Sequence, residues 1–125
     1  MNNCDFFSSP IGLGHVTRDI AIVKNLEDFS VNFVTGSGAA KILKKLNYNI
    51  DDVYNPPSFV VENGVLNNQT KWLWNYYQYY KNCKNISEKI IKKNNSELVI
   101  SDEDFASLTI AQEVKIPNIL FDYLI

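Results

Sequence analysis

Short apolar runs alternate with amphipathic runs along this chain, and the alternation limits the folds that it can adopt. Four runs are apolar almost throughout rather than at every second position, namely residues 4–8, 31–34, 98–101 and 118–121. Strands of this kind are typical of a parallel sheet that is covered on both faces. Apolar residues three and four positions apart follow the first three runs, and this spacing predicts helices. The pattern therefore predicts a doubly wound, Rossmann-like α/β domain of about five strands.

Helices are expected from near Val16, over residues 39–46, over about 69–93 and over 105–114. The third strand is expected from residues 50–54 or 59–61, because the prolines between these segments forbid one unbroken strand. The expected strand order is 3-2-1-4-5, in which the first and fourth strands are neighbours.

Composition sets limits on the partners of the chain. Its 125 residues, 46% of them apolar, suit one domain spanning residues 1–125. A net charge of -2 and a pI near 5.3 disfavour binding along a nucleic acid. Cys4 and Cys83 lie outside any C-x-x-C pattern, so we expect buried free thiols and no metal site. No signal peptide or membrane-spanning stretch is evident, which predicts a cytoplasmic location.

The loop after the first strand carries most of the candidate chemistry. It reads SSPIGLGHVTRDIAIV over residues 8–23 and contains Gly12, Gly14, Arg18 and the sole histidine, His15. A dinucleotide-binding G-x-G-x-x-G motif would need a third glycine where Thr17 stands, and the second strand does not end in an acidic residue. No nicotinamide or flavin cofactor is therefore expected. In the plain structural alternative, the glycines permit a turn, the histidine begins a helix and the arginine is solvated.

The acidic triplet after the fourth strand favours a chemical role for the loop over the structural alternative. Asp102, Glu103 and Asp104 directly follow residues 98–101. Because ligands of doubly wound sheets bind where the carboxyl ends of the first and fourth strands meet, His15 and this triplet should share one crevice. A carboxylate on one ring nitrogen leaves the other able to accept a proton. We expect Asp102 to contact His15 as its partner and Asp104 to cap the following helix, although either aspartate suits a cap.

Three stretches resemble the N-terminal, acceptor-side domain of GT-B glycosyltransferases, in the group of the UDP-glucuronosyltransferases and the lipid II N-acetylglucosaminyltransferase. They are PIGLGHVTRDIAIVKNLE, VNFVTGSGAAKIL and LVISDEDFASLTIAQEVKIPNI. The resemblance is weakest over residues 51–96. It implies half of a GT-B fold, with the donor-binding domain supplied by further sequence or by a partner subunit.

The resemblance also implies roles for individual residues. His15 would deprotonate an acceptor hydroxyl and Asp102 would orient it, so that transfer from a nucleotide sugar, expected to be a UDP-sugar, inverts the anomeric carbon. The substrate-binding residues would be Gly12, Gly14, Arg18, Thr35, Gly36 and Glu103. No metal or other cofactor is implied. The alternative is a non-catalytic Rossmann-like module that binds a phosphorylated ligand or a partner chain.

Residues 72–80 of the expected long helix are rich in tryptophan and tyrosine. Three interpretations remain open for this segment. Tyr76, Tyr80 and Cys83 would cover the sheet; Trp72, Trp74, Tyr77 and Tyr79 would form a wall for a sugar or lipid acceptor; or the helix would attach to a membrane surface, giving a peripheral location.

Overall fold

A five-stranded parallel sheet forms the centre of the protein. The computed structural model describes residues 2–10, 13–56, 61–62, 65–66 and 69–121. The strands of the sheet lie in the order β3-β2-β1-β6-β7 and all their pairings are parallel. They are β1 (Asn2–Ser8), β2 (Phe29–Thr35), β3 (Ile50–Asp52), β6 (Leu98–Asp102) and β7 (Asn118–Phe121). The predicted doubly wound sheet and its strand order are confirmed.

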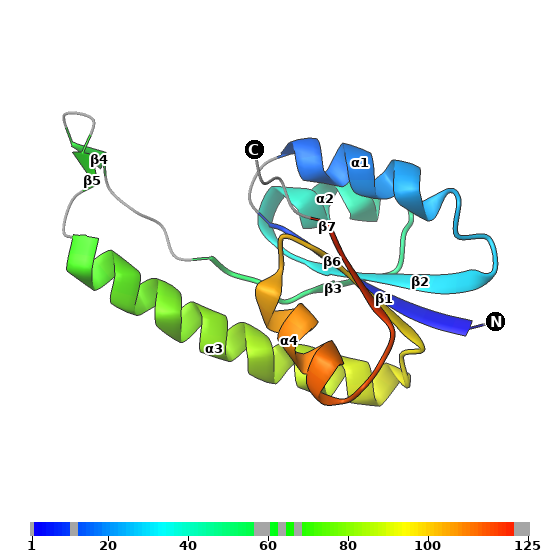
Figure 1. Ribbon diagram of the computed structural model, residues 1–125. Coiled ribbons are helices and arrows are strands. Elements are labelled where there is room, and N and C mark those ends of the chain that lie inside the picture. The colour runs from blue at the N-terminus through cyan, green and yellow to red at the C-terminus, as the bar shows by residue number, and fades with distance from the viewer. Residues whose placement is uncertain (1, 11–12, 57–60, 63–64, 67–68, 122–125) are drawn as a thin grey trace.

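Helices cover both faces of this sheet (Figure 1). On one face lie α1 (Leu13–Val23) and α2 (Ser37–Lys45), and on the other lie α3 (Gln69–Asn94) and α4 (Phe105–Glu113). Each face has its own apolar core: Phe6, Phe33 and Ile100 belong to the core under α1 and α2, whereas Phe7 and Val99 belong to the core under α3 and α4. Neighbouring residues of one strand thus face opposite layers, as the pleat requires.

The same alternation decides where polar residues at the end of β6 point. Asp102 lies two positions after Ile100, so its side chain faces the α1 layer. Ser101 faces the other layer, where its hydroxyl lies 2.7 Å from that of Ser107 in α4. The pleat of β6 therefore directs one carboxylate toward α1.

The third strand is formed by Ile50–Asp52, the first of the two segments that the sequence offered. Of the second segment, Val61 belongs to β4 (Val61–Glu62), which pairs with β5 (Val65–Leu66) in a separate antiparallel pair. Residues 59–60 lie outside the described part of the chain. This small pair was not predicted, because strands of two residues carry no periodic signal.

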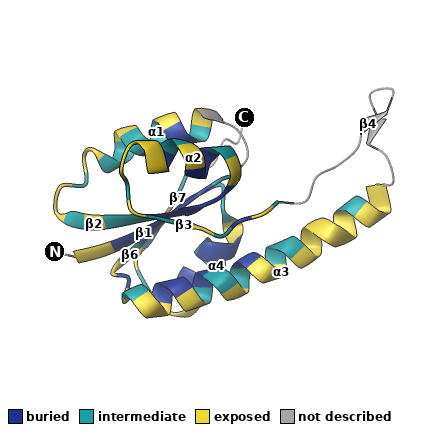
Figure 2. Ribbon diagram, turned by 180° about the vertical axis from the view of Figure 1, so that it is seen from behind, coloured by how far each residue is buried: buried dark blue, intermediate teal, exposed yellow. Residues whose placement is uncertain are grey.

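The 26-residue helix α3 extends well past the sheet, and β4 and β5 lie beyond its N-terminal end (Figure 1). Its C-terminal half is partly buried against the domain, whereas its N-terminal half is largely exposed (Figure 2). None of the described helices, α3 included, is long and apolar enough to cross a membrane.

Both cysteines are buried and free, as predicted. Burial raises the pKa of the Cys4 and Cys83 thiols to about 12, so both remain protonated at neutral pH. Neither thiol is suited to act as a nucleophile in this state.

Candidate active site

His15 and Asp102 meet above the carboxyl ends of β1 and β6. His15 Nδ1 lies 3.2 Å from Asp102 Oδ1, and the side chains are 16% and 0% exposed. The predicted contact between these residues, 87 positions apart, is therefore present. Because a carboxylate oxygen accepts hydrogen bonds, Nδ1 is the ring nitrogen that donates to Asp102.

His15 is held by a helix rather than by a loop. The sequence places the start of the first helix near Val16, but α1 begins at Leu13, so Gly14 and His15 form its first turn. Gly14 is exposed, and a Cβ atom built on it would meet nothing within 4 Å. Because a helix fixes backbone direction, the imidazole is more firmly oriented than a loop residue would be.

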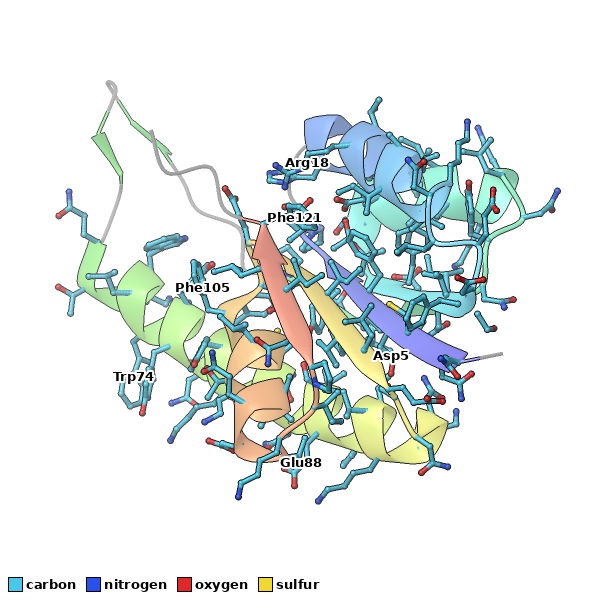
Figure 3. The ribbon with its side chains drawn as sticks, turned by 45° about the vertical axis from the view of Figure 1, so that its right-hand side comes forward. Asp5, Arg18, Trp74, Glu88, Phe105 and Phe121 are labelled. Atoms are coloured by element: carbon cyan, nitrogen blue, oxygen red, sulfur yellow. The ribbon has the colours of Figure 1, made fainter. Side chains whose placement is uncertain are left out.

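Arg18 adds a positive charge one turn further along α1. Its guanidinium donates to Asp102 Oδ1, the oxygen that His15 also contacts, and its Cζ lies 5.3 Å from the centre of the Phe121 ring. Figure 3 shows Arg18 and Phe121 together at one end of the sheet, with Asp5 at the opposite end. Arg18 therefore places a positive charge against the buried Asp102 side chain, and its own side chain remains 29% exposed.

Glu103 lies on the other side of the imidazole. Its Oε2 is 3.6 Å from His15 Nε2, and its backbone φ of 53° lies in the left-handed region that non-glycine residues rarely adopt. The Glu103 N–H donates to the Phe121 carbonyl oxygen over 2.8 Å, which anchors this conformation between β6 and β7. Strain of this kind is common at functional sites.

A pocket of about 130 Å³ adjoins Glu103 on the α3 and α4 side of the domain. The loop after β1, the segment after β6 and α3 all contribute to its wall. It is lined by Ser9, Pro10, Tyr54, Tyr76, Tyr79, Tyr80, Cys83, Glu103, Asp104, Phe105 and Ala106. The wall is mainly aromatic and apolar, with carboxylates at one side, and its volume is close to the roughly 150 Å³ of a cavity that binds benzene.

The aromatic segment of α3 is divided between this pocket and the surface. Tyr79 lines the pocket as expected for an acceptor wall, but so do Tyr76 and Tyr80, which were expected to cover the sheet. Trp74 is 61% exposed and projects from the outer side of α3 (Figure 3). Tyr77, also expected in an acceptor wall, is exposed as well.

Asp104 stands at the N-cap position of α4, as expected, but its side chain makes no capping hydrogen bond. Its carboxylate accepts a hydrogen bond of 2.8 Å from the Tyr54 hydroxyl, which also lies 2.9 Å from Ser87 Oγ. Burial raises the pKa of Asp104, while the hydrogen bond from Tyr54 lowers it. Through Tyr54, Asp104 thus links the N-terminus of α4 to the segment after β3 and to α3. Its neighbours Asp102 and Glu103 are the carboxylates that lie next to His15.

The remaining predicted binding residues lie in different surroundings. Thr35 is buried at the end of β2, and its hydroxyl has no hydrogen-bond partner among the described residues. Gly36 is buried at the N-cap of α2, directly against the Tyr54 backbone. Gly12 lies outside the described residues.

Sequence reasoning missed two residues of this site, Ser8 and Asp19. Both are fully buried, and Ser8 Oγ donates to Asp19 Oδ2. Asp19 follows His15 by four positions, so the two share one face of α1, and this spacing is a signal that could have pointed to it.

Solved structures of glycosyltransferases share this fold. The kitacinnamycin glycotransferase aligns over 94% of this chain and 29% of its own, with a TM-score of 0.72 and 11% identity. MurG of Acinetobacter baumannii aligns over 96% and 34%, with a TM-score of 0.69 and 16% identity. The chain has a GT-B glycosyltransferase-like fold.

A ligand-bound relative in fold is Phytolacca americana UGT2, complexed with UDP-2fluoro-glucose and pterostilbene. It aligns over 95% of this chain and 30% of its own, with a TM-score of 0.60 and 18% identity. The chain thus spans about a third of the length of these glycosyltransferases. The C-terminal domain of the Pyrococcus furiosus PF1911 hydrogenase also matches, over 97% of this chain and 92% of its own, with a TM-score of 0.63 and 11% identity. No protein-family model and no curated protein matches the chain.

Proposed function

We propose that this chain is the acceptor-binding half of an inverting glycosyltransferase, with His15 as the general base. The observation that carries the proposal is the position of the imidazole: Nδ1 is held by Asp102, and Nε2 faces Glu103, which lines the aromatic pocket. An acceptor in this pocket whose hydroxyl extends past Glu103 to Nε2 would pass its proton to that nitrogen.

The reaction would be one displacement. The acceptor oxygen attacks the anomeric carbon of a nucleotide sugar while its proton passes to His15 Nε2, and the bond from that carbon to the diphosphate oxygen breaks. Asp102 stabilises the resulting imidazolium. A separate donor-binding domain, in the same polypeptide or on a partner subunit, would hold the UDP-sugar and assist the departure of the diphosphate.

The pocket points to the class of acceptor. Tyr76, Tyr79 and Tyr80 offer ring faces for stacking, and the volume of about 130 Å³ suits a single ring. We expect a hydroxylated aromatic acceptor, or one whose attacked sugar stacks in the same way. Gly12, Gly14 and Arg18 are proposed to line the side of the cleft toward the diphosphate, whereas Thr35 and Gly36 are buried and are not proposed to contact it.

The test compares the wild type with His15→Gln in an assembly that includes the donor-binding domain, using UDP-glucose and pterostilbene as probes. Because the base is lost, transfer should fall by about 10²- to 10⁴-fold. Pterostilbene binding, followed by quenching of tyrosine and tryptophan fluorescence, should persist. The exposed Lys45→Gln serves as the control. Unchanged transfer in His15→Gln would remove His15 from the role of base.

A non-catalytic binding module is the second candidate. The match to the PF1911 domain supports it, since a domain of nearly this size and fold occurs there in a hydrogenase and not in a glycosyltransferase. This candidate predicts binding of UDP or pterostilbene without transfer in any assembly, and equal ligand affinity in the wild type and His15→Gln.

A further inference from the structure

Asp19 is an acidic side chain in a position where an ionised carboxylate is costly. It is 0% exposed and lies in α1, four residues after His15. The groups that face it are Ser8 from β1, Arg18 from α1 and Asp102 from β6. A second buried carboxylate beside it makes an ionised Asp19 less favourable still, because like charges at short range repel.

The hydrogen bonds of the two carboxyl groups leave one oxygen unused on each. Asp19 Oδ2 accepts from Ser8 Oγ, and Asp102 Oδ1 receives both His15 Nδ1 and Arg18. Asp19 Oδ1 and Asp102 Oδ2 are buried, and neither has a hydrogen-bond donor among the described residues. Asp102 is nevertheless close enough to Asp19 to raise the pKa of Asp19, both through a hydrogen bond between the two side chains and through charge repulsion. One proton between the unused oxygens would satisfy both groups.

The surroundings decide which carboxyl group keeps this proton. Asp102 Oδ1 accepts hydrogen bonds from the Arg18 guanidinium and the His15 N–H, which makes Asp102 the acceptor of the pair. Among the described residues, Asp19 accepts a hydrogen bond from the Ser8 hydroxyl alone. The pKa of Asp19 is raised from 3.8 to about 8, mainly by burial and then by Asp102, while Ser8 and Arg18 lower it less.

We propose that Asp19 is a positioning residue, a neutral carboxylic acid that donates a hydrogen bond to Asp102 and holds that carboxylate against His15. With the bond in place, each oxygen of Asp102 has its own donors, so the carboxylate is fixed in rotation. The hydrogen-bonded series Ser8, Asp19, Asp102 and His15 then keeps Nδ1 directed at Asp102 and Nε2 directed at Glu103. Its catalytic consequence rests on the proposed function, but the proton itself can be observed without any activity.

The first experiment detects the proton by ¹³C NMR of the 125-residue chain labelled at aspartate carboxyl carbons. One carboxyl group should remain protonated at pH 7, ionise near pH 8, and be absent from Asp19→Asn. Asp104 also has a raised pKa, so assignment by Asp19→Asn is essential. Ionisation of every carboxyl group well below pH 7, or a signal unchanged in Asp19→Asn, would overturn the proposal.

The second experiment tests positioning through the single imidazole, whose ¹⁵N signals come from His15 alone. Asp19→Asn retains an N–H donor for Asp102, whereas Asp19→Leu has a similar volume and no donor. The Nδ1–H form should dominate in the wild type and Asp19→Asn and become mixed in Asp19→Leu. If Asp19→Leu does not fold, the wild type is compared with Asp19→Asn from pH 7 to 9. The share of the Nδ1–H form should fall with rising pH only in the wild type. An equal fall in Asp19→Asn would contradict the proposal.

Transfer assays then separate this proposal from the proposed function. In the assembly with the donor-binding domain, Asp19→Leu should lower kcat on the order of 10- to 100-fold with little change in KM, and Asp19→Asn should restore most of the loss. Equal loss in both variants would indicate a merely structural role. Absence of transfer in the wild type, with the NMR signals intact, would reject the proposed function alone.

Discussion

Gly36 packs directly against the backbone carbonyl group of Tyr54. A Cβ atom built on Gly36 would overlap the Tyr54 carbonyl oxygen and stand 2.8 Å from its carbonyl carbon. Backbone atoms cannot move aside as a flexible side chain can, and Tyr54 is held by the hydrogen bond from its N–H to the Thr35 carbonyl. The glycine is therefore required for close approach, because its φ of -168° is extended and open to any residue.

Gly36→Ala should lower the free energy of unfolding by more than about 2 kcal/mol, because the added methyl group forces the β3 connection away from β2. The matched control is Gly14→Ala, where the added atom meets open space within a helix. That variant should be neutral or more stable by up to about 1 kcal/mol. Urea denaturation of both variants provides the measurement, and equal stabilities would contradict the interpretation.

The Tyr54 hydroxyl links Asp104 to Ser87, and its removal should destabilise the fold. Tyr54→Phe leaves the buried Asp104 carboxylate without this donor, which should cost about 1–3 kcal/mol. Tyr77→Phe, on the exposed part of α3, should change stability by less than about 0.5 kcal/mol. Thermal unfolding of the two variants at one pH tests this difference. A Tyr54→Phe protein as stable as Tyr77→Phe would show that the link contributes nothing.

Stability should fall as pH rises from about 4 to about 8. The pKa of Asp19 is raised from 3.8 to about 8 in the folded protein, mainly by burial, so the folded state binds a proton that the unfolded state releases. Unfolding is then favoured as pH rises through this window. Asp104, with a raised pKa, contributes in the same direction. Asp19→Asn should flatten the curve, as measured by urea denaturation at several pH values. A curve of unchanged slope would argue against the raised pKa of Asp19.

The left-handed conformation of Glu103 should be relieved by glycine. Glu103→Gly removes an unfavourable φ of 53°. Lys115→Gly, just after the C-terminal end of α4, removes an unfavourable φ of 59°. Because glycine adopts this region without strain but loses more chain entropy, each change should stabilise the protein by up to about 1 kcal/mol. Only Glu103→Gly should alter pterostilbene binding, since Glu103 lines the pocket and Lys115 does not. Altered binding in both variants would show a general effect of the fold.

The order of the strands and the pairing of His15 with Asp102 could be predicted from sequence. Apolar runs and their periodicity are local properties, and the order of a doubly wound sheet places the ends of β1 and β6 side by side. The short pair β4 and β5 and the exact start of α1 could not be predicted, because neither changes the periodicity enough to be seen.

The sequence by itself determined the layers of this protein and the loops that meet at the end of its sheet, because the alternation of apolar and amphipathic runs is a local property of the chain. Only the tertiary structure decided that Asp19 is fully buried beside Asp102. It also decided that the Asp104 side chain accepts a hydrogen bond from the Tyr54 hydroxyl and makes no capping hydrogen bond to α4. The physical reason is that burial and hydrogen-bond partners depend on side chains from elements far apart in sequence. Whether a carboxyl group carries a proton is fixed by those neighbours and not by the residue itself.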